Sequence, residues 1–202
     1  MSKNSTQKST VHRHGSDRGF SMIELLVVLF IIIATSAIAL PNFIKMFRAS
    51  QLTNGATQVA DILKQTRFQA IRRNTPVVCR IAGSSTSTTI WADVDGNPTG
   101  ADPGEQQTLL SGAVNLVAAG NVPGTGALAA GVGTNVVLVP VSPTNGTYTF
   151  DQRGAVNPAS VYVSYVTNSA LPALGYRAIV LLPSGSIQIW TGDTAGNWQL
   201  LE

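Results

Sequence analysis

The stretch from Leu25 to Leu40 most constrains what this chain can fold into, because only Thr35 and Ser36 in it are polar. Apolar residues on both sides lengthen the stretch further. A helix that crosses a bilayer needs about 20 predominantly apolar residues. The sequence therefore predicts one membrane-spanning helix. No second run is long enough, which excludes a multi-span membrane protein.

Charged residues are few and unevenly placed along the 202 residues. They form 11% of the chain against 44% hydrophobic residues, which excludes a disordered polyelectrolyte and a densely charged nucleic-acid binder. Residues 1–19 carry four basic residues and one acidic residue. Residues 45–73 carry six basic residues and one acidic residue, whereas residues 74–202 carry three basic and seven acidic residues. The basic leader precedes the apolar run, so the positive-inside rule predicts a cytoplasmic amino terminus and a translocated domain after residue 45.

Glu24 places a carboxylate at the edge of the apolar stretch. A charge inside a membrane segment costs about 2.5–3.5 kcal/mol on insertion scales and is usually paired or functional. The alternative is that Glu24 only reaches back to the cytoplasmic interface. The residues after Leu40 are PNFIK rather than the small-residue cleavage site of a secretory signal, so we expect the apolar segment to stay attached.

Arg18, Gly19, Phe20 and Glu24, directly before the apolar run, resemble the type III signal of type IV prepilins and pseudopilins. The resemblance implies that prepilin peptidase cuts between Gly19 and Phe20 on the cytoplasmic side, and that Phe20 is then N-methylated. We expect Glu24 to be neutralised by the freed amine of Phe20 on a neighbouring subunit, which favours assembly. Pro41 lies where pilins commonly carry a proline, and a kink or local melting is expected there.

Beyond Pro41 the apolar pattern becomes one-sided and predicts an amphipathic helix. The predicted buried stripe comprises Leu52, Ala56, Val59, Leu63, Thr66 and Ala70. The opposite stripe comprises Gln51, Asn54, Gln58, Asp61, Gln65 and Arg72. One helix from about residue 20 to residue 73 would be roughly 80 Å long. It should end before Asn74-Thr75-Pro76, because the residue before a proline disfavours the helical region.

After Pro76, short β-branched runs alternate with glycine, proline and asparagine, which predicts strands. The candidate strands are Val77–Ala82, Thr86–Ala92, Thr108–Val117, Val136–Val141, Thr147–Phe150, Ser160–Val166, Tyr176–Leu182, Ser186–Trp190 and Trp198–Leu201. The glycine-rich stretch Ala118–Asn135 is predicted to be a long, exposed and flexible loop. The expected fold is α+β, with an antiparallel sheet docked on the amphipathic half of the helix.

Three later motifs narrow the resemblance to the GspH/FimT family of minor pilins and pseudopilins. Arg67 and QAIRRNTPV at 69–77 resemble its helix-end signature, and WADVDGN at 91–97 with Gly104-Glu105 resembles its aspartate-rich hairpin. FDQRG at 150–154 and LPSG at 182–185 resemble its two late strand turns. The resemblance covers nearly the whole chain after residue 18.

The family resemblance implies four segments and a location. These are a leader at 1–19, a transmembrane helix half at 20–44, an amphipathic helix half at 45–75 and a periplasmic β domain at 76–202. The protein would be a single-pass protein of the bacterial inner membrane that joins other pilins or pseudopilins in a filament. A type II secretion pseudopilus is the favoured system. The alternatives are a type IV pilus minor pilin for pilus biogenesis or DNA uptake, and an anchored binding domain that never polymerises.

Five oxygen-bearing side chains lie within thirteen residues and suggest a calcium site. They are Asp93, Asp95, Asn97, Asp102 and Glu105. The spacing departs from an EF-hand loop, because the glycine comes fourth rather than sixth and Glu105 comes one residue late. The alternative is an acidic hairpin tip that keeps a sheet edge soluble. No other cofactor is expected.

The sequence offers little for catalysis or for nucleic acid. The only histidines, His12 and His14, lie in the predicted leader, and Cys79 alternates within an apolar strand as a buried small residue would. Some relatives in transformation pili bind DNA through arginines near the carboxy terminus, but the corresponding turn here, Gly185 to Gln188, has none. We therefore expect neither an enzyme nor a direct DNA-binding role.

Overall fold

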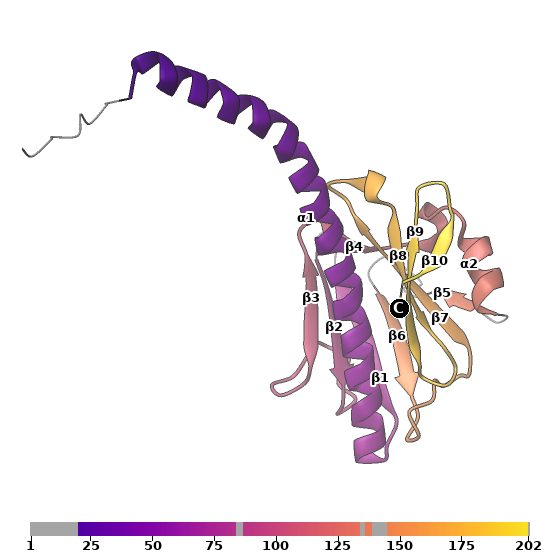
Figure 1. Cartoon of the computed structure of the whole chain (residues 1–202). Coiled ribbons are helices and arrows are strands. Elements are labelled where there is room, and N and C mark those ends of the chain that lie inside the picture. The colour runs from indigo at the N-terminus through magenta and orange to yellow at the C-terminus, as the bar shows by residue number, and fades with distance from the viewer. Residues whose placement is uncertain (1–19, 84–86, 134–135, 139–144, 202) are drawn as a thin grey trace, which may run out of the picture. The chain divides into compact units, whose positions relative to one another are not determined.

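A computed structural model describes residues 20–83, 87–133, 136–138 and 145–201. The predicted leader at 1–19 and the residues 139–141 of one predicted strand lie outside this range. The chain divides into two units, Met1–Asn42 and Phe43–Glu202. Helix α1, Met22–Arg73, runs through the boundary between them (Figure 1).

Helix α1 confirms the predicted buried stripe, because all six of its residues are buried. Gly55, Ala60 and Ile62 are buried as well, so the buried face is wider than the six predicted residues. The helix is continuous through Pro41, and the local melting expected there is not seen. A kink at Pro41 stays a prediction.

The carboxyl end of α1 falls where the sequence predicts it, and Asn74 provides the termination. Asn74 has a left-handed φ of 52°. Its amide donates to the carbonyl of Ile71 over 3.2 Å, and the amide of Thr75 donates to the carbonyl of Ala70 over 3.3 Å. These two bonds form a Schellman motif, which satisfies carbonyls that the helix leaves open. The basic side chains of Arg72 and Arg73 lie in this last turn, where they complement the helix dipole.

Among the described residues, the strands form two sheets rather than the single sheet predicted. The first sheet has the order β3-β2-β1-β6, and all its pairs are antiparallel. Its strands are β1 (Val77–Gly83), β2 (Ser87–Asp93), β3 (Gln107–Ser111) and β6 (Asn145–Phe150). The second sheet has the order β10-β9-β8-β7-β4. The strands in this order are β4 (Val114–Val117), β7 (Val161–Asn168), β8 (Tyr176–Leu181), β9 (Ile187–Gly192) and β10 (Trp198–Leu200), and β5 (Val136–Leu138) joins the sheet beside β7.

Two features of the sheets correct the sequence-based prediction. The predicted strand Thr108–Val117 is interrupted at Gly112, whose φ of 75° suits a turn, so that β3 and β4 belong to different sheets. The short strand β5 (Val136–Leu138) pairs with β7 in parallel, while the prediction had only antiparallel pairs. The assignment of β3 and β4 to different sheets and the parallel pairing of β5 depend on the path of the connecting segments. The periodicity of a single strand carries no information on that path.

The glycine-rich stretch Ala118–Asn135 is not only a loop. It contains a short 3-10 helix, η1 (Ala119–Asn121), and helix α2 (Thr125–Val132). Leu128 of α2 is only 1% exposed and belongs to a cluster with Val161, Val163 and other residues of the second sheet. The prediction of a long exposed loop is therefore wrong, because tertiary packing of Leu128 outweighs the low helix propensity of the glycines.

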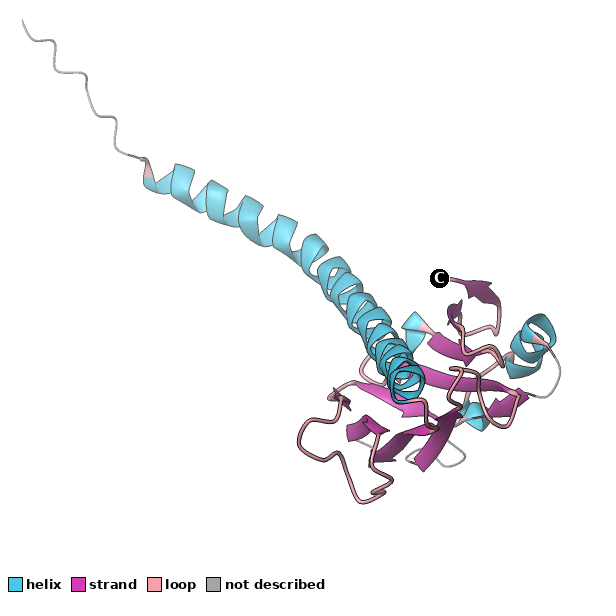
Figure 2. Cartoon of the chain, turned by 90° about the horizontal axis from the view of Figure 1, so that it is seen from below, coloured by secondary structure: helices cyan, strands magenta, loops and turns pink. Residues whose placement is uncertain are grey.

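The second sheet has an apolar core on each face. Ile179, Leu181 and Ile189 belong to the main cluster, which also contains the buried stripe of α1. Ala178 and Val180, the alternating residues of β8, belong to the cluster beneath α2. Figure 1 and Figure 2 show α2 and α1 on different sides of these strands. Cys79 is buried in the main cluster, as predicted, and burial raises its pKa to about 12, so its thiol stays protonated.

Leu63→Ala should lower the free energy of unfolding by about 2–5 kcal/mol, because it opens a cavity in the core between α1 and the sheets. The matched control is Lys64→Ala, since Lys64 makes only an exposed pair with Asp61 and should change stability by less than about 0.5 kcal/mol. Denaturant unfolding of the full chain in detergent, followed by tryptophan fluorescence, measures both. Equal losses in the two variants would contradict this core.

Candidate functional site

The most conspicuous surface is the apolar first part of α1. Every large apolar side chain described between Phe20 and Phe47 is exposed, with 91% exposure at Met22 and 73% at Ile38. By length and composition α1 can cross a membrane, with a mean hydropathy of 2.7 in its most apolar window. A continuous apolar surface of this size needs lipid or other protein around it.

Glu24 interrupts this surface in the first turn of α1. Its neighbours Leu25 and Leu26 are 57% and 61% exposed, so the carboxylate lies among apolar side chains. Within the described residues, Glu24 makes no ion pair. The carboxylate is therefore open to a partner from outside this chain.

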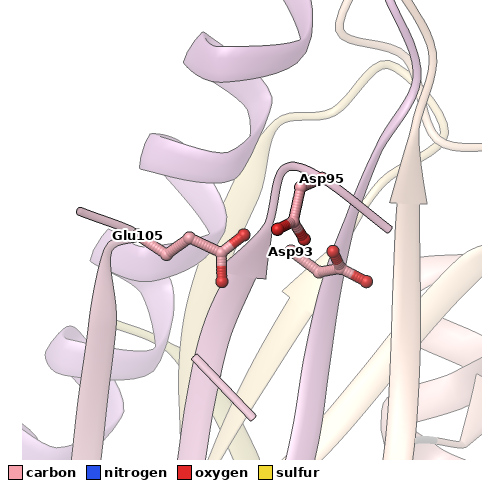
Figure 3. A group of neighbouring side chains, drawn as sticks. All are labelled: Asp93, Asp95 and Glu105. Carbon is pink, nitrogen blue, oxygen red and sulfur yellow. The ribbon is translucent and has the colours of Figure 1, made fainter. Parts of the chain in front are cut away.

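The acidic hairpin between β2 and β3 brings together three of the five predicted calcium ligands. One carboxylate oxygen each from Asp93, Asp95 and Glu105 lies within 4.8 Å of the other two (Figure 3). Asp102 is not part of this group of carboxylates, and its Oδ2 accepts from the Nδ2 of Asn97 over 2.9 Å. The calcium site stays a prediction, with three carboxylates as its candidate ligands.

The same carboxylates already organise the hairpin. Oε1 of Glu105 accepts from the amide of Val94 over 2.6 Å, and its Oε2 accepts from the amide of Asp102 over 3.0 Å. Oδ1 of Asp93 accepts from the amide of Gly96 over 2.7 Å. These bonds explain the acidic residues without a metal, since each replaces a missing backbone partner in the turn.

Arg80 is a residue of this site that sequence reasoning missed. Its Nε makes an ion pair with Oδ2 of Asp93, whose side chain is fully buried. A buried carboxylate is stable only when it is paired and hydrogen-bonded, and Arg80 supplies that pair from β1. The one available signal was a lone arginine at an alternating position of an otherwise apolar strand.

A second missed contact joins the motifs at the carboxyl end of α1. Nε of Arg67 donates to the carbonyl of Gly154 over 3.0 Å. Gly154 and Gly185 both have φ of 79°, and a Cβ on Gly185 would lie 2.0 Å from the carbonyl oxygen of Gly154. The glycines are therefore required for two turns and the helix to meet at one point.

A long helix, apolar in its first half and packed through its second half on β-sheets, defines the architecture of type IV pilin-like proteins. The family described as type II transport protein GspH matches residues 55–185, and the chain belongs to this family. The match confirms the resemblance read from the motifs, and it supports a pseudopilin or pilin role and membrane anchoring.

Among solved structures the chain is similar to the type IV minor pilin FimU of Pseudomonas aeruginosa PAO1 in two crystal forms. In space group P21 the identity is 13% and the TM-score 0.47, with 74% of this chain and 93% of FimU covered. In space group P65 the identity and TM-score are the same, with 73% and 97% covered. A comparison with curated protein sequences gives no match.

Calcium bound by Asp93, Asp95 and Glu105 should raise the midpoint of thermal unfolding of the full chain in millimolar CaCl₂, because a ligand of the native state stabilises it. Asp95→Asn should abolish the increase, because it removes one of the three carboxylates. Asp95 suits the test because it is exposed, while Asp93 forms a buried ion pair whose loss would itself change stability. MgCl₂ at equal concentration is the control. No increase, and no heat on titration with Ca²⁺, would show that the carboxylates only hold the hairpin together.

Proposed function

We propose that this protein is a minor pseudopilin, a non-enzymatic subunit of a type II secretion pseudopilus that supports protein secretion. Prepilin peptidase removes residues 1–19 and methylates Phe20, residues 20–44 anchor the chain in the inner membrane, and the domain after residue 45 lies in the periplasm. Membership of a family described by type II transport supports the secretion system. The single observation that carries the proposal is an exposed apolar helix whose first turn holds a carboxylate, Glu24, with no ion pair among the described residues.

The carboxylate of Glu24 gives the chain a reason to assemble rather than stay alone. An anchor needs no charge at this position, and the charge costs free energy in lipid. The membrane deprives the carboxylate of Glu24 of its contact with water. After cleavage, the new amine of Phe20 on a neighbouring subunit can pair with Glu24 and compensate for that loss. Lateral association of helices then relieves a cost that each isolated subunit carries.

The alternative system is a type IV pilus, in which the same helix and the same processing would build a different filament. A DNA-uptake role is less well supported by this chain. The described β domain carries few cations, and the turn at Gly185 to Gln188 offers no arginine to phosphate. Complementation of strains that lack either the pseudopilus or the pilus subunit separates the two systems.

Glu24→Ala should leave membrane insertion intact and abolish incorporation into filaments, because it removes the carboxylate that needs a partner. The matched control is Asp61→Ala, which removes an exposed carboxylate from the amphipathic part of the same helix and should assemble normally. Membrane fractionation measures insertion, and recovery of sheared filaments measures assembly. Normal assembly of Glu24→Ala would contradict the charge-pairing mechanism.

Mass spectrometry of the protein from cells that contain prepilin peptidase should show a mature chain that begins with N-methylated Phe20. In cells without the peptidase, the leader should remain on the chain. Replacement of Gly19 by valine should also keep the leader, because the branched side chain no longer fits a protease that cuts after glycine. An intact leader on the wild-type chain would overturn the proposed processing.

A further inference from the structure

Arg177 occupies an unusual place for a cation, near the start of an internal strand of the second sheet. It lies on β8, between Thr191 of β9 and Val166 of β7. Its alternating neighbours on the same strand, Ile179 and Leu181, belong to the main apolar core. Arg177 therefore lies on the face of the sheet that packs toward α1, and the following residues of β8 on that face are apolar.

The guanidinium of Arg177 lacks the partners that such a position demands. Its Nε is buried and has no hydrogen-bond partner in the described part of the chain, where its Nη1 donates to the carbonyl of the adjacent Tyr176 over 3.0 Å. Among the described residues it makes no ion pair. Burial lowers the pKa of Arg177, which reflects the cost of holding a cation away from water. A partly buried charge is normally compensated by a counter-ion.

Arg177 lines a hollow of about 240 Å³. Register places Arg177, Thr191 and Gln199 in one cross-strand row over β8, β9 and β10, so their side chains lie on the same face. Leu174 from the 3-10 helix η2 (Pro172–Leu174) closes one side, and the turn at Asp193 and Asn197 closes another. The row offers a guanidinium, a hydroxyl and an amide to one ligand.

Asp193 does not act as the counter-ion within this hollow. Its Oδ1 accepts from the amides of Ala195 and Asn197, each over 2.9 Å, and its Oδ2 accepts from Nδ2 of Asn197 over 2.7 Å. These bonds commit its carboxylate to the turn between β9 and β10. Its negative charge also disfavours a doubly charged anion such as phosphate at the same place, because like charges repel at short range.

We propose that Arg177, Thr191 and Gln199 form a binding site for a single carboxylate, and that its occupant is an aspartate or glutamate side chain of a neighbouring subunit. A carboxylate matches the paired N–H groups on one edge of a guanidinium, which two parallel hydrogen bonds can engage. The second half of the proposal rests on the proposed function, since it requires a filament. The β domain of this chain can supply such a side chain to a neighbouring copy, because residues 74–202 contain seven acidic residues.

The site is tested on the full chain in detergent, with nitrogen-15 in its arginines, by following the Nε–Hε signals during titration with sodium acetate. Sodium chloride at equal ionic strength is the control. The Arg177 signal, assigned by its loss in Arg177→Lys, should shift and saturate, while that of the exposed Arg153 should not. Thr191→Val should weaken acetate binding about three- to tenfold, the effect of one lost hydrogen bond. Parallel, unsaturable shifts at both arginines would overturn the site, and tighter binding of inorganic phosphate would overturn the choice of carboxylate.

The occupant is tested by assembly in cells. Arg177→Gln should reduce incorporation into filaments at least severalfold, whereas Arg153→Gln should not, with folding of both checked by thermal unfolding. If Arg177→Gln assembles normally while Glu24→Ala does not, the neighbouring subunit is not the occupant and the proposed function stands. If Glu24→Ala also assembles normally, the proposed assembly mechanism fails, while saturable acetate binding would still establish the carboxylate site.

Discussion

The apolar surface of the first part of α1 is the constraint on which the rest of the protein depends. Its large side chains from Phe20 to Phe47 are exposed, and no soluble domain tolerates that much uncovered apolar area. Lipid can cover it, and so can the helices of other subunits. Lipid alone gives no reason for Glu24, because a carboxylate at this position only raises the cost of insertion. The same helix is therefore suited to exchange lipid for protein neighbours.

The second part of α1 solves a different problem, which is to hold the β domain on the helix. Here only one stripe is apolar, and it is buried throughout. Gly55 lets the helix approach the sheets closely, since a Cβ there would lie 2.5 Å from Cγ1 of Val114. At the carboxyl end, Arg67 fixes the turn at Gly154. The helix thus joins a part that needs partners to a part that is already packed.

Local pattern was sufficient to predict the features that depend on near neighbours in the sequence. The stripe from Leu52 to Ala70 and the helix end at Arg73 follow from periodicity and from Asn74-Thr75-Pro76. Pattern could not predict the ion pair of Arg80 with Asp93, because the fold decides which strands lie side by side. It also could not find α2, since this eight-residue helix has two glycines and only Leu128 and Val132 as large apolar residues, too few to show a helical period. Sequence spacing likewise could not tell which carboxylates of the acidic hairpin lie together, and the fold brings Asp93, Asp95 and Glu105 into one group.

Glu24 and Arg177 are both charged groups without an ion-pair partner among the described residues, and they differ in what such a partner would contribute. In lipid, helices gain no hydrophobic free energy from each other, so packing and polar pairs must supply the association. An ion pair at Glu24 can supply association but fixes only the height of one helix against the next. A side chain held by the fork of Arg177 would also fix how one β domain is rotated against its neighbour, because two parallel hydrogen bonds are directional. A helical filament needs a defined height and a defined rotation from one subunit to the next, since a contact that does not close into a ring builds a regular helix only when both are set.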